Sequence, residues 1–448
     1  MNKLWPAAAA ALCLSACAQP GSDDPLAGFG PNPRLPAPRH SLIPMVGIPK
    51  VVGWTRDAAP RAPAGFTVTR FAQGLDHARW LYVLPNGDVL ASESASEPSE
   101  ADVNSQGIKG FFAKMLMKNV GSARKSPDKI VLLRDTDGDG VAETSAIFAH
   151  EGLHQPFGMT LVGGKLYVAN SDGVVAFDYV DGQTQASGPP VKVFDLPGGP
   201  INHHWTKNVV ASPDGTKLYA TVGSNSNIGE NGMEAETGRA AIWVYDIASG
   251  QARVFASGIR NPNGIDFEPT TGAMWTVSNE RDEIGPDLPP DYLTSVRDGG
   301  FYGWPYSYWG KHVDDRVKPQ KPDLVAKAIA PDYGVGAHTA ALGLTFYRAD
   351  AFPAHYRGGA FIGQHGSWNR QPLNGYRVVF VPFADGKPQT PAEVFLTGFL
   401  NAEDEIQGRP VGVVVDRSGA LLVADDVGGI VWRVAPAKPA PSEGPSPS

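Results

Sequence analysis

The sequence predicts an all-β protein built as one six-bladed β-propeller, and three observations support this prediction. Glycine and proline are frequent, at 52 and 40 of 448 residues, and runs such as KLYVAN and VVFVP are β-branched or aromatic, which is typical of short strands joined by tight turns. One phrase recurs along the chain: an apolar strand, a turn such as PNG or PDG, and a second strand. No long charged or Pro/Ser-rich stretch divides the interior, which favours a single large domain.

The repeated phrase occurs six times, at residues 78–94, 155–171, 206–224, 262–280, 341–366 and 409–426. A further strand pair follows most copies, so that one unit holds the four strands of a propeller blade, and six copies predict six blades. The early segment 66–75 is expected to pair with the terminal strand GIVWRV, which would close the ring and remove two open edges. A β-helix or open solenoid is the alternative, and it would need shorter, more uniform repeats with polar caps.

The N-terminus has the features of an export signal. Lys3 is followed by an apolar run that is too short to span a bilayer, and then by the letters LSAC ending at Cys17, which resemble the lipobox of bacterial lipoproteins. We therefore expect residues 1–16 to be a signal peptide and Cys17 to carry a lipid. The protein would then be exported and anchored to a membrane of the cell envelope, facing the periplasm or the exterior. An ordinary secretory signal with a chance cysteine is the alternative.

Composition sets the remaining boundaries. Residues 17–65 are rich in Pro, Ala and Gly and are predicted to be a tether between membrane and domain. Residues 66–434 are expected to form the propeller, and residues 435–448 a disordered tail. The formal net charge of −8, without a compensating Lys/Arg stripe, argues against nucleic acid as a partner.

Polar residues beside the repeated strands are the candidates for function, because the loops on one face of a propeller build its site. His203 and His204 precede the third copy, and a histidine has the neutral-pH proton affinity of a general base. Arg79, Arg260 and Arg409 occupy equivalent places in the first, fourth and sixth copies. Guanidinium groups that converge in this way indicate a ligand with several anionic groups. Salt bridges between blades are the alternative.

Other unusual side chains lie at strand ends. Glu280 and Asp282 belong to a carboxylate-rich run after the fourth copy, and such hard oxygen ligands suit calcium, although a solvated acidic loop would look the same. His338 precedes the fifth copy. At the end of that copy stand His365, Trp368 and Arg370. They supply another imidazole, an indole and a guanidinium, on which a flat aromatic ligand could stack.

The hairpin DTDGDGVAE begins like a calcium loop, with Asp135, Asp137 and Asp139 at alternate positions. The twelfth position of the loop is Ala146 instead of an acidic residue, so a tight turn with at most a weakly bound structural ion is expected. The chain has no GxGxxG after a strand, no Walker lysine loop and no G-x-S-x-G elbow. Its chemistry is therefore expected to come from a bound group.

Several motifs together resemble those of the soluble pyrroloquinoline quinone (PQQ) sugar dehydrogenases, and most closely the L-sorbosone dehydrogenase or pyranose dehydrogenase branch. The resemblance spans about residues 66–434. It is carried by RWLYVLPNGDVL, HWTKNVVASPDGTKLYATVGS, GIRNPNGIDF, NERDEIGPDLPPDYL, GGFYGWPY, FPAHYRGGAFIGQHGSWNR and GRPVGVVVD. It implies a six-bladed propeller with PQQ and a calcium ion at the channel mouth. It also implies a sugar or polyhydroxy aldehyde as substrate, and a quinone or cytochrome as electron acceptor.

The resemblance assigns roles to individual residues. His204, and not His203, matches the family's general base, which takes the proton of the substrate hydroxyl while hydride passes to carbon C5 of the quinone. Calcium near Glu280 and Asp282 would polarise the quinone. The implied cofactor ligands are Arg79, Arg260, Asn261, His338 and Arg409.

Two departures from the better-known glucose-oxidising members leave the metal ligands and the sugar open. Their calcium loop has Gly-Pro where this chain has Glu280-Arg281, and a lysine contact of the fifth blade is replaced by part of GQHGSWNR. Two other functions stay open as alternatives. One is a calcium-dependent lactonase of a related propeller type, which the arginine cluster disfavours, and the other is a non-enzymatic binding propeller on the cell surface.

Overall fold

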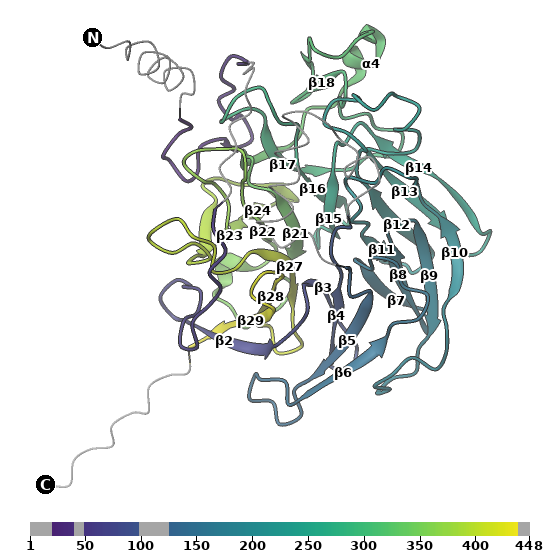
Figure 1. The fold of residues 1–448 in the computed structure, drawn as a ribbon, viewed down its shortest axis with the longest axis vertical. Helices are drawn as coiled ribbons and strands as arrows, with labels where there is room; N and C mark the ends of the chain where they lie inside the picture. The colour runs from purple at the N-terminus through teal and green to yellow at the C-terminus, as the bar shows by residue number, and fades with distance from the viewer. Residues whose placement is uncertain (1–19, 40–48, 98–124, 438–448) are drawn as a thin grey trace, which may run out of the picture.

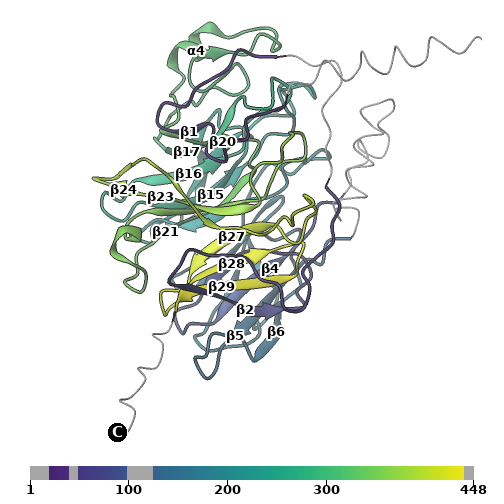
Figure 2. The ribbon, with the colours of Figure 1, turned by 90° about the vertical axis from the view of Figure 1, so that its left-hand side faces the viewer.

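The computed structural model describes residues 20–39, 49–97 and 125–437, and it confirms the predicted six-bladed β-propeller (Figure 1). Six antiparallel sheets surround a central axis, five with four strands and one with five. The first strand of each repeated phrase lies next to the axis, because these six strands contact one another around the ring. Figure 2 shows the sheets from the side.

In blades 1 to 3 the strands follow chain order from the axis outward. Blade 1 contains β3 (Ala78–Val83), β4 (Val89–Glu93), β5 (Lys129–Arg134) and β6 (Thr144–Ala149). Blade 2 contains β7 (Met159–Val162), β8 (Lys165–Asn170), β9 (Gly173–Asp178) and β10 (Val191–Asp195). Blade 3 contains β11 (Val209–Ala211), β12 (Lys217–Val222), β13 (Ala241–Asp246) and β14 (Gln251–Ser257).

The other three blades repeat the pattern with additions. Blade 4 contains β15 (Pro262–Phe267), β16 (Met274–Ser278), β17 (Pro290–Ser295), β20 (Tyr333–Ala337) and, outermost, β1 (Phe29–Gly30). Blade 5 contains β21 (Ala341–Phe346), β22 (Ala360–Gln364), β23 (Arg377–Val381) and β26 (Glu393–Leu396), with the 3-10 turn η1 (Ala354–Tyr356) and the small hairpin β24 (Phe383–Ala384) and β25 (Lys387–Pro388). Blade 6 contains β27 (Pro410–Val415), β28 (Leu421–Asp425), β29 (Ile430–Pro436) and β2 (Phe66–Gln73).

The ring closes as predicted, through pairing of β2 with β29. The register runs from Phe66 opposite Pro436 to Gln73 opposite Ile430, so the first strand of the propeller completes its last blade. Because β29 continues to Pro436 and Ala437 N donates to Gly65 O at 2.8 Å, the tail predicted to begin at residue 435 does not begin before residue 438.

The prediction that residues 17–65 form a tether is wrong for their described parts. Residues 20–39, which we name the strap, supply β1 (Phe29–Gly30) and pair with β20. Residues 49–65 lie along blades 5 and 6, where the Trp54 indole donates to a buried aspartate at 2.6 Å. A few apolar and aromatic side chains anchor a segment whose overall composition is that of a linker. The predicted signal peptide, its Cys17 and the last eleven residues lie outside the described residues.

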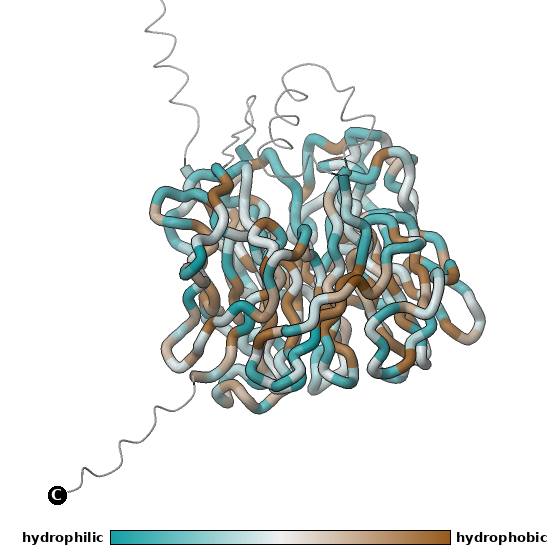
Figure 3. Tube along the Cα trace, turned by 60° about the horizontal axis from the view of Figure 1, so that its bottom comes forward, coloured by the Kyte–Doolittle hydropathy of each residue, from teal (hydrophilic) through white to brown (hydrophobic). Residues whose placement is uncertain are grey.

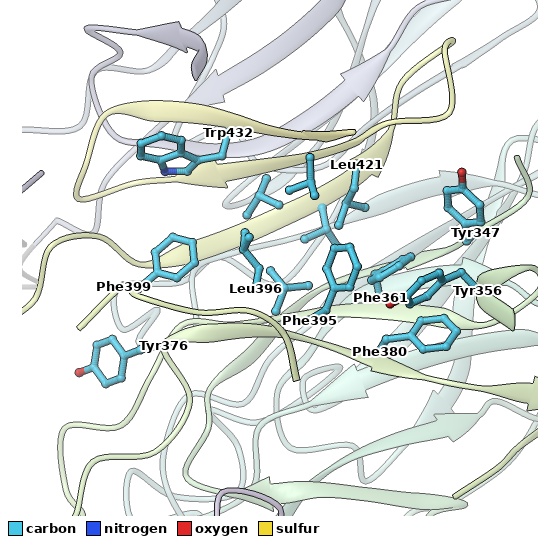
Figure 4. Packing of buried hydrophobic residues seen from close by; sticks show 14 of the residues in the cluster. Tyr347, Tyr356, Phe361, Tyr376, Phe380, Phe395, Leu396, Phe399, Leu421 and Trp432 are labelled. Carbon is cyan, nitrogen blue, oxygen red and sulfur yellow. The ribbon is translucent and has the colours of Figure 1, made fainter. Parts of the chain in front are cut away.

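The core lies between neighbouring blades, where sheet faces pack against each other. Between blades 5 and 6 a cluster of aromatic residues fills this space (Figure 4), with Phe361, Phe380, Phe399 and Trp432 buried completely. Figure 3 shows apolar residues concentrated in the sheets and polar residues in many of the loops. Removing these faces from water supplies the main driving force for folding.

An insertion between β17 and β20 rises along the outside of the propeller. Phe301 bridges to Ser257 of β14, and the segment beyond it holds β18 (Ser307–Tyr308), β19 (His312–Val313) and α4 (Pro322–Lys327). The insertion is joined to the loop after β16 by a buried ion pair between Asp314 and Arg281. In the part of the chain that the structure describes, no helix is long and apolar enough to cross a membrane.

Candidate functional site

A cavity of about 590 Å³ lies at the end of the propeller axis where the repeated phrases begin. Its walls come from five of the six blades, so residues distant in sequence meet there. The eight propeller residues to which the resemblance gave a catalytic, cofactor-binding or metal-binding role all line this one cavity: Arg79, His204, Arg260, Asn261, Glu280, Asp282, His338 and Arg409. The ninth nominated residue, Cys17, lies outside the described residues.

The floor of the cavity is apolar. It is a buried cluster of single side chains from five blades, Trp80, Phe157, Trp205, Leu342 and Val411. The cluster separates the cavity from a second hollow of about 460 Å³ at the other end of the axis. Such a floor keeps the polar walls above it away from bulk water in the channel.

The surroundings of His204 fix the tautomer that a general base needs, with the hydrogen on Nδ1. Its Nδ1 lies 2.7 Å from the carbonyl oxygen of Ser224 and 3.1 Å from the Ser224 hydroxyl. Because a carbonyl oxygen only accepts hydrogen bonds, Nδ1 must carry the hydrogen, and Nε2 keeps its lone pair. Burial, reinforced by the nearby charge of Arg260, holds the pKa of His204 well below its ordinary value. The imidazole is therefore neutral at physiological pH.

Close packing around Gly223 fixes this histidine. A Cβ atom at Gly223 would lie 2.5 Å from His204 Cβ and 2.3 Å from Asn261 Oδ1, which is far inside normal contact distance. Below the loop, the fully buried ammonium of Lys207 lies 3.4 Å from the carbonyl oxygen of His204 and supports it. The absence of a side chain at Gly223 thus sets the spacing of two predicted site residues.

Arg260 is buried and donates to backbone and side-chain amide oxygens. Its Nη1 donates to Glu280 O at 2.8 Å, and its Nη2 donates to Asn227 Oδ1 at 3.2 Å. The nearest carboxylate, that of Asp282, is 3.7 Å away. Arg409 is similar, since it donates to the carbonyl oxygens of His365 and the following glycine at 2.9 and 2.8 Å. Among the described residues Arg409 forms no ion pair and Arg260 forms only this long one, which leaves positive charge for an anionic ligand.

Asp282 forms one polar group with His338. His338 Nδ1 lies 3.2 Å from Asp282 Oδ1, and Asn369 Nδ2 donates to the same oxygen at 2.7 Å. Burial would raise the pKa of Asp282, but the bond to His338 and the charge of Arg260 lower it. Burial would likewise lower the pKa of His338, but its bond to Asp282 raises it. The folded surroundings therefore favour the ionised form of both residues.

A second polar group centres on Asp426 across the cavity. Arg79 forms an ion pair with this carboxylate, and His365 Nε2 donates to it at 2.9 Å. Burial, with the charge of Arg409, lowers the pKa of His365 to about 3. Of the three arginines predicted to meet an anionic ligand, Arg79 thus already has a carboxylate partner. Its Nε, however, is buried without a hydrogen-bond partner.

Two buried carboxylates, Glu280 and Asp291, form no ion pair with any described residue. Burial raises the pKa of Glu280 to about 7 and also raises that of Asp291. Asp291 accepts hydrogen bonds from Glu280 N, the Thr339 hydroxyl and Ala340 N at 2.8, 3.0 and 2.9 Å. The two carboxylates line the same part of the wall, and together they suit a cation.

Three buried polar atoms of the cavity wall have no hydrogen-bond partner. They are Arg79 Nε, Asn261 Oδ1 and Asn263 Oδ1. Leaving such atoms unpaired costs about 1–3 kcal/mol each. Their common location is explained if a bound polar molecule completes the wall.

Two sequence expectations fall outside the cavity. Arg370 was expected beside the ligand, but it is buried behind the wall, where it donates to Asp287 and to three backbone carbonyl oxygens. The carboxylates of the Asp135 hairpin do converge, because Glu143 joins the three aspartates within 4.8 Å. These four residues lie on the β5–β6 turn and do not line the cavity.

Comparison with known proteins places the chain in a family. The family model described as TrAA12-like matches residues 128–288 and 320–437, more than half of the chain. The chain belongs to the TrAA12-like family. This confirms the resemblance drawn from the motifs.

Relatives of this TrAA12-like protein have sugar-oxidising names. The pyrroloquinoline quinone-dependent pyranose dehydrogenase of Coprinopsis cinerea is 27% identical over 294 residues, covering 52% of this chain and 39% of that protein. The holo form of its PQQ domain superposes with a TM-score of 0.66 at 21% identity, over 86% of this chain and 98% of the domain. A calcium structure of a Trichoderma reesei family AA12 enzyme superposes with a TM-score of 0.67 at 20% identity, over 85% of this chain and 97% of that enzyme. The solved structures support the shared fold.

Sequence reasoning missed several residues of the TrAA12-like site. Asp426 ends the sixth repeated phrase, so the rule applied to strand ends could have found it. Asp291 lies inside β17, and Asn369 lies in an irregular loop, where the repeat carries no signal. Both were out of reach because their partners are distant in sequence.

Gly223→Ala should disturb the site more than the fold. The new methyl group must displace His204 or Asn261, and we expect overpacking to lower the free energy of unfolding by about 1–3 kcal/mol. Urea denaturation checks this. Gly188→Ala is the matched control, because no atom lies within 4 Å of its Cβ position. Equal stability of the two variants would contradict the packing described above.

His365→Gln should make the apoprotein less sensitive to acid. The pKa of His365 is about 3 in the folded protein against an ordinary value of 6.5, so between these values the unfolded chain binds a proton that the folded chain does not. The free energy of unfolding of the wild type therefore decreases as the pH is lowered through this range. Between pH 7 and pH 4.5 the wild type should lose about 2–3 kcal/mol more of it than the variant does. Denaturation at pH 7 and pH 4.5 measures it, with His150→Gln as an exposed control. Parallel profiles for wild type and His365→Gln would refute the assignment.

Proposed function

We propose that this protein is a PQQ- and calcium-dependent dehydrogenase that oxidises an aldose, pyranose or sorbosone-like polyhydroxy aldehyde. The observation that carries the proposal is the cavity, where a neutral histidine with a free lone pair lies among the guanidinium groups of Arg79, Arg260 and Arg409. The names of the relatives support the same chemistry. The lactonase alternative has no specific observation in its favour.

The residues of the cavity fit PQQ. This cofactor is planar and carries three carboxylates. These suit Arg409, which forms no ion pair among the described residues, and Arg260, whose ion pair with Asp282 is long, at 3.7 Å. Arg79 Nε would gain an acceptor, and Asn261 would gain a partner for its buried oxygen. His338 would contribute through its positive charge. When bound, the quinone accepts the hydride of the substrate at its carbon C5.

Calcium would be held by carboxylates beside the cofactor. Glu280 and Asp291 are the better pair, because their pKa values are raised by burial and a cation would stabilise their ionised forms. Asp282, the other residue nominated from the sequence, is already engaged by His338 and Asn369. It would act mainly by orienting these two side chains.

His204 would act as the general base. Its Nε2 takes the proton of the substrate hydroxyl while the hydrogen on the same carbon leaves as hydride, so that the carbon is oxidised by two electrons. The carbonyl oxygen of Ser224, 2.7 Å from Nδ1, stabilises the resulting imidazolium and keeps the ring in place. Burial and Arg260 favour prompt loss of that proton, which restores the base for the next turnover.

The expected setting is the cell envelope. A lipid on Cys17 would anchor the enzyme to a membrane, and its electrons would pass to a quinone or cytochrome. Replacing Cys17 by Ser should release the protein from membranes, whereas unchanged membrane association would contradict the anchor.

Reconstitution tests the function. PQQ and calcium are added to purified apoprotein, and dye reduction is followed with a panel of aldoses, sorbosone and lactones. We expect PQQ to bind at micromolar concentration and aldose- or sorbosone-dependent reduction to follow. Absence of quinone binding at that concentration would overturn the proposal, and hydrolysis of lactones without dye reduction would favour the lactonase.

His204→Gln should retain cofactor binding and lose turnover. Removal of a general base lowers kcat by about 10²–10⁴-fold, and PQQ titration followed by absorbance distinguishes this from loss of the cofactor. His203→Gln is the matched comparison, because that side chain is adjacent but exposed, and its loss should be far smaller. Full turnover by His204→Gln would show that another group is the base.

A further inference from the structure

The strap begins on the rim of the cavity. Gly21 N donates to Gln371 O at 2.7 Å, and Ser22 N donates to the Asp287 carboxylate at 3.0 Å. Arg370, which is only 2% exposed, donates to Ser22 O and to Asp287, each at 2.7 Å. The first described residues of the chain are therefore fixed in place by a buried guanidinium.

The loops that hold the strap are loops that line the cavity. Arg370 also donates to Pro286 O at 2.9 Å and to Pro372 O at 2.5 Å. The first of these loops carries Asp282 and the second carries Asn369, which bind each other at 2.7 Å. The strap thus starts on the face of the propeller where the cavity opens.

Cys17 precedes the first described residue, Pro20, by three residues. A fully extended chain advances at most about 3.6 Å per residue, so Cys17 can be no farther than about 11 Å from Pro20. If Cys17 carries the proposed lipid, the bilayer surface lies within the same short reach of the cavity rim.

The insertion between β17 and β20 carries a basic segment. Residues 311–327 contain five Lys or Arg against three Asp, in a chain of net charge −8. They are joined to the cavity loop by the ion pairs Arg281–Asp314 and Arg316–Glu283. Lys311 and Lys318 are exposed and form no ion pair within the described part of the chain, and Val313 nearby is 53% exposed.

From these observations we propose that the rim formed by the strap and residues 311–327 docks on the anionic surface of the bilayer, with the mouth of the cavity facing the membrane. The proposal rests on the lipid anchor of the proposed function. Acyl chains on Cys17 hold the rim near the surface, and the lysines add attraction to anionic headgroups, each strengthening binding by about fivefold. Two independent contacts thus orient the protein on the bilayer: the acyl chains attached to Cys17 and the electrostatic attraction of the lysines.

A single-cysteine reporter tests the orientation. The mature chain has no cysteine other than the acylated Cys17, so Val313→Cys can be labelled specifically with an environment-sensitive fluorophore. Val180→Cys is the control, because Val180 is 66% exposed and lies beside the Gly164 turn at the opposite face. Full-length lipidated protein is placed in phosphatidylglycerol and phosphatidylethanolamine vesicles that contain nitroxide-labelled headgroups.

We expect the nitroxide to quench the probe at position 313 at least twofold more strongly than the probe at position 180. A flexible twelve-residue Gly/Ser insertion after Cys17 should reduce the difference while leaving dye reduction by detergent-solubilised protein unchanged. Equal quenching of the two probes in vesicle-bound protein would overturn the orientation but leave the anchor intact. Protein that carries no lipid and stays off the vesicles would overturn both.

Charge reversal separates the electrostatic contact from the lipid. In the unlipidated Cys17→Ser protein, Lys311→Glu with Lys318→Glu should weaken binding to phosphatidylglycerol vesicles at least tenfold. Lys387→Glu, an exposed lysine of the β24–β25 hairpin away from this rim, should change it little. Equal effects of the two changes would show that the rim has no special contact with the bilayer.

Discussion

Pairing between β2 and β29 is the constraint on which the rest of this structure depends. The walls of the cavity come from five blades, and no pair of neighbouring blades holds more than part of them. Only a closed ring brings Arg79 of the first blade against Asp426 of the last, and only a closed ring brings the five side chains of the floor together. The chemistry of the site is thus a property of the whole ring.

Charges in the cavity are paired in some parts of the wall and not in others. Two groups on opposite sides of the cavity pair their charges internally, Asp426 with Arg79 and Asp282 with His338. Elsewhere Arg260 and Arg409 donate mainly to neutral oxygens, with one long ion pair of 3.7 Å from Arg260 to Asp282. Burial raises the pKa values of Glu280 and Asp291 in the same part of the wall. A planar trianion and a divalent cation would together balance both excesses, which is why we regard the two ligands as mutually dependent.

Much of this arrangement could be predicted from the sequence, for a definite reason. Each repeated phrase has one geometry, so polar residues at its ends had to meet at one end of the axis, and the eight nominated propeller residues do line one cavity. Partners outside the phrase, such as Asp291 and Asn369, could not be found, because their neighbours depend on packing between distant loops. The strap was misjudged because short anchors such as Trp54 and Phe29 carry little weight in a composition dominated by proline, alanine and glycine.

The closure also has a consequence for folding. β2 is synthesised early, but its partner β29 is complete only when Pro436 has been made, so this strand must wait for nearly the whole chain. Contacts of such long sequence separation form slowly, and an unpaired edge is an aggregation hazard meanwhile. The alternation of half-buried and exposed residues along Phe66–Arg70, with Thr67 and Thr69 on the exposed side, leaves one face of the waiting strand polar. Such a face would help the strand stay soluble until the final step joins the two ends of the ring.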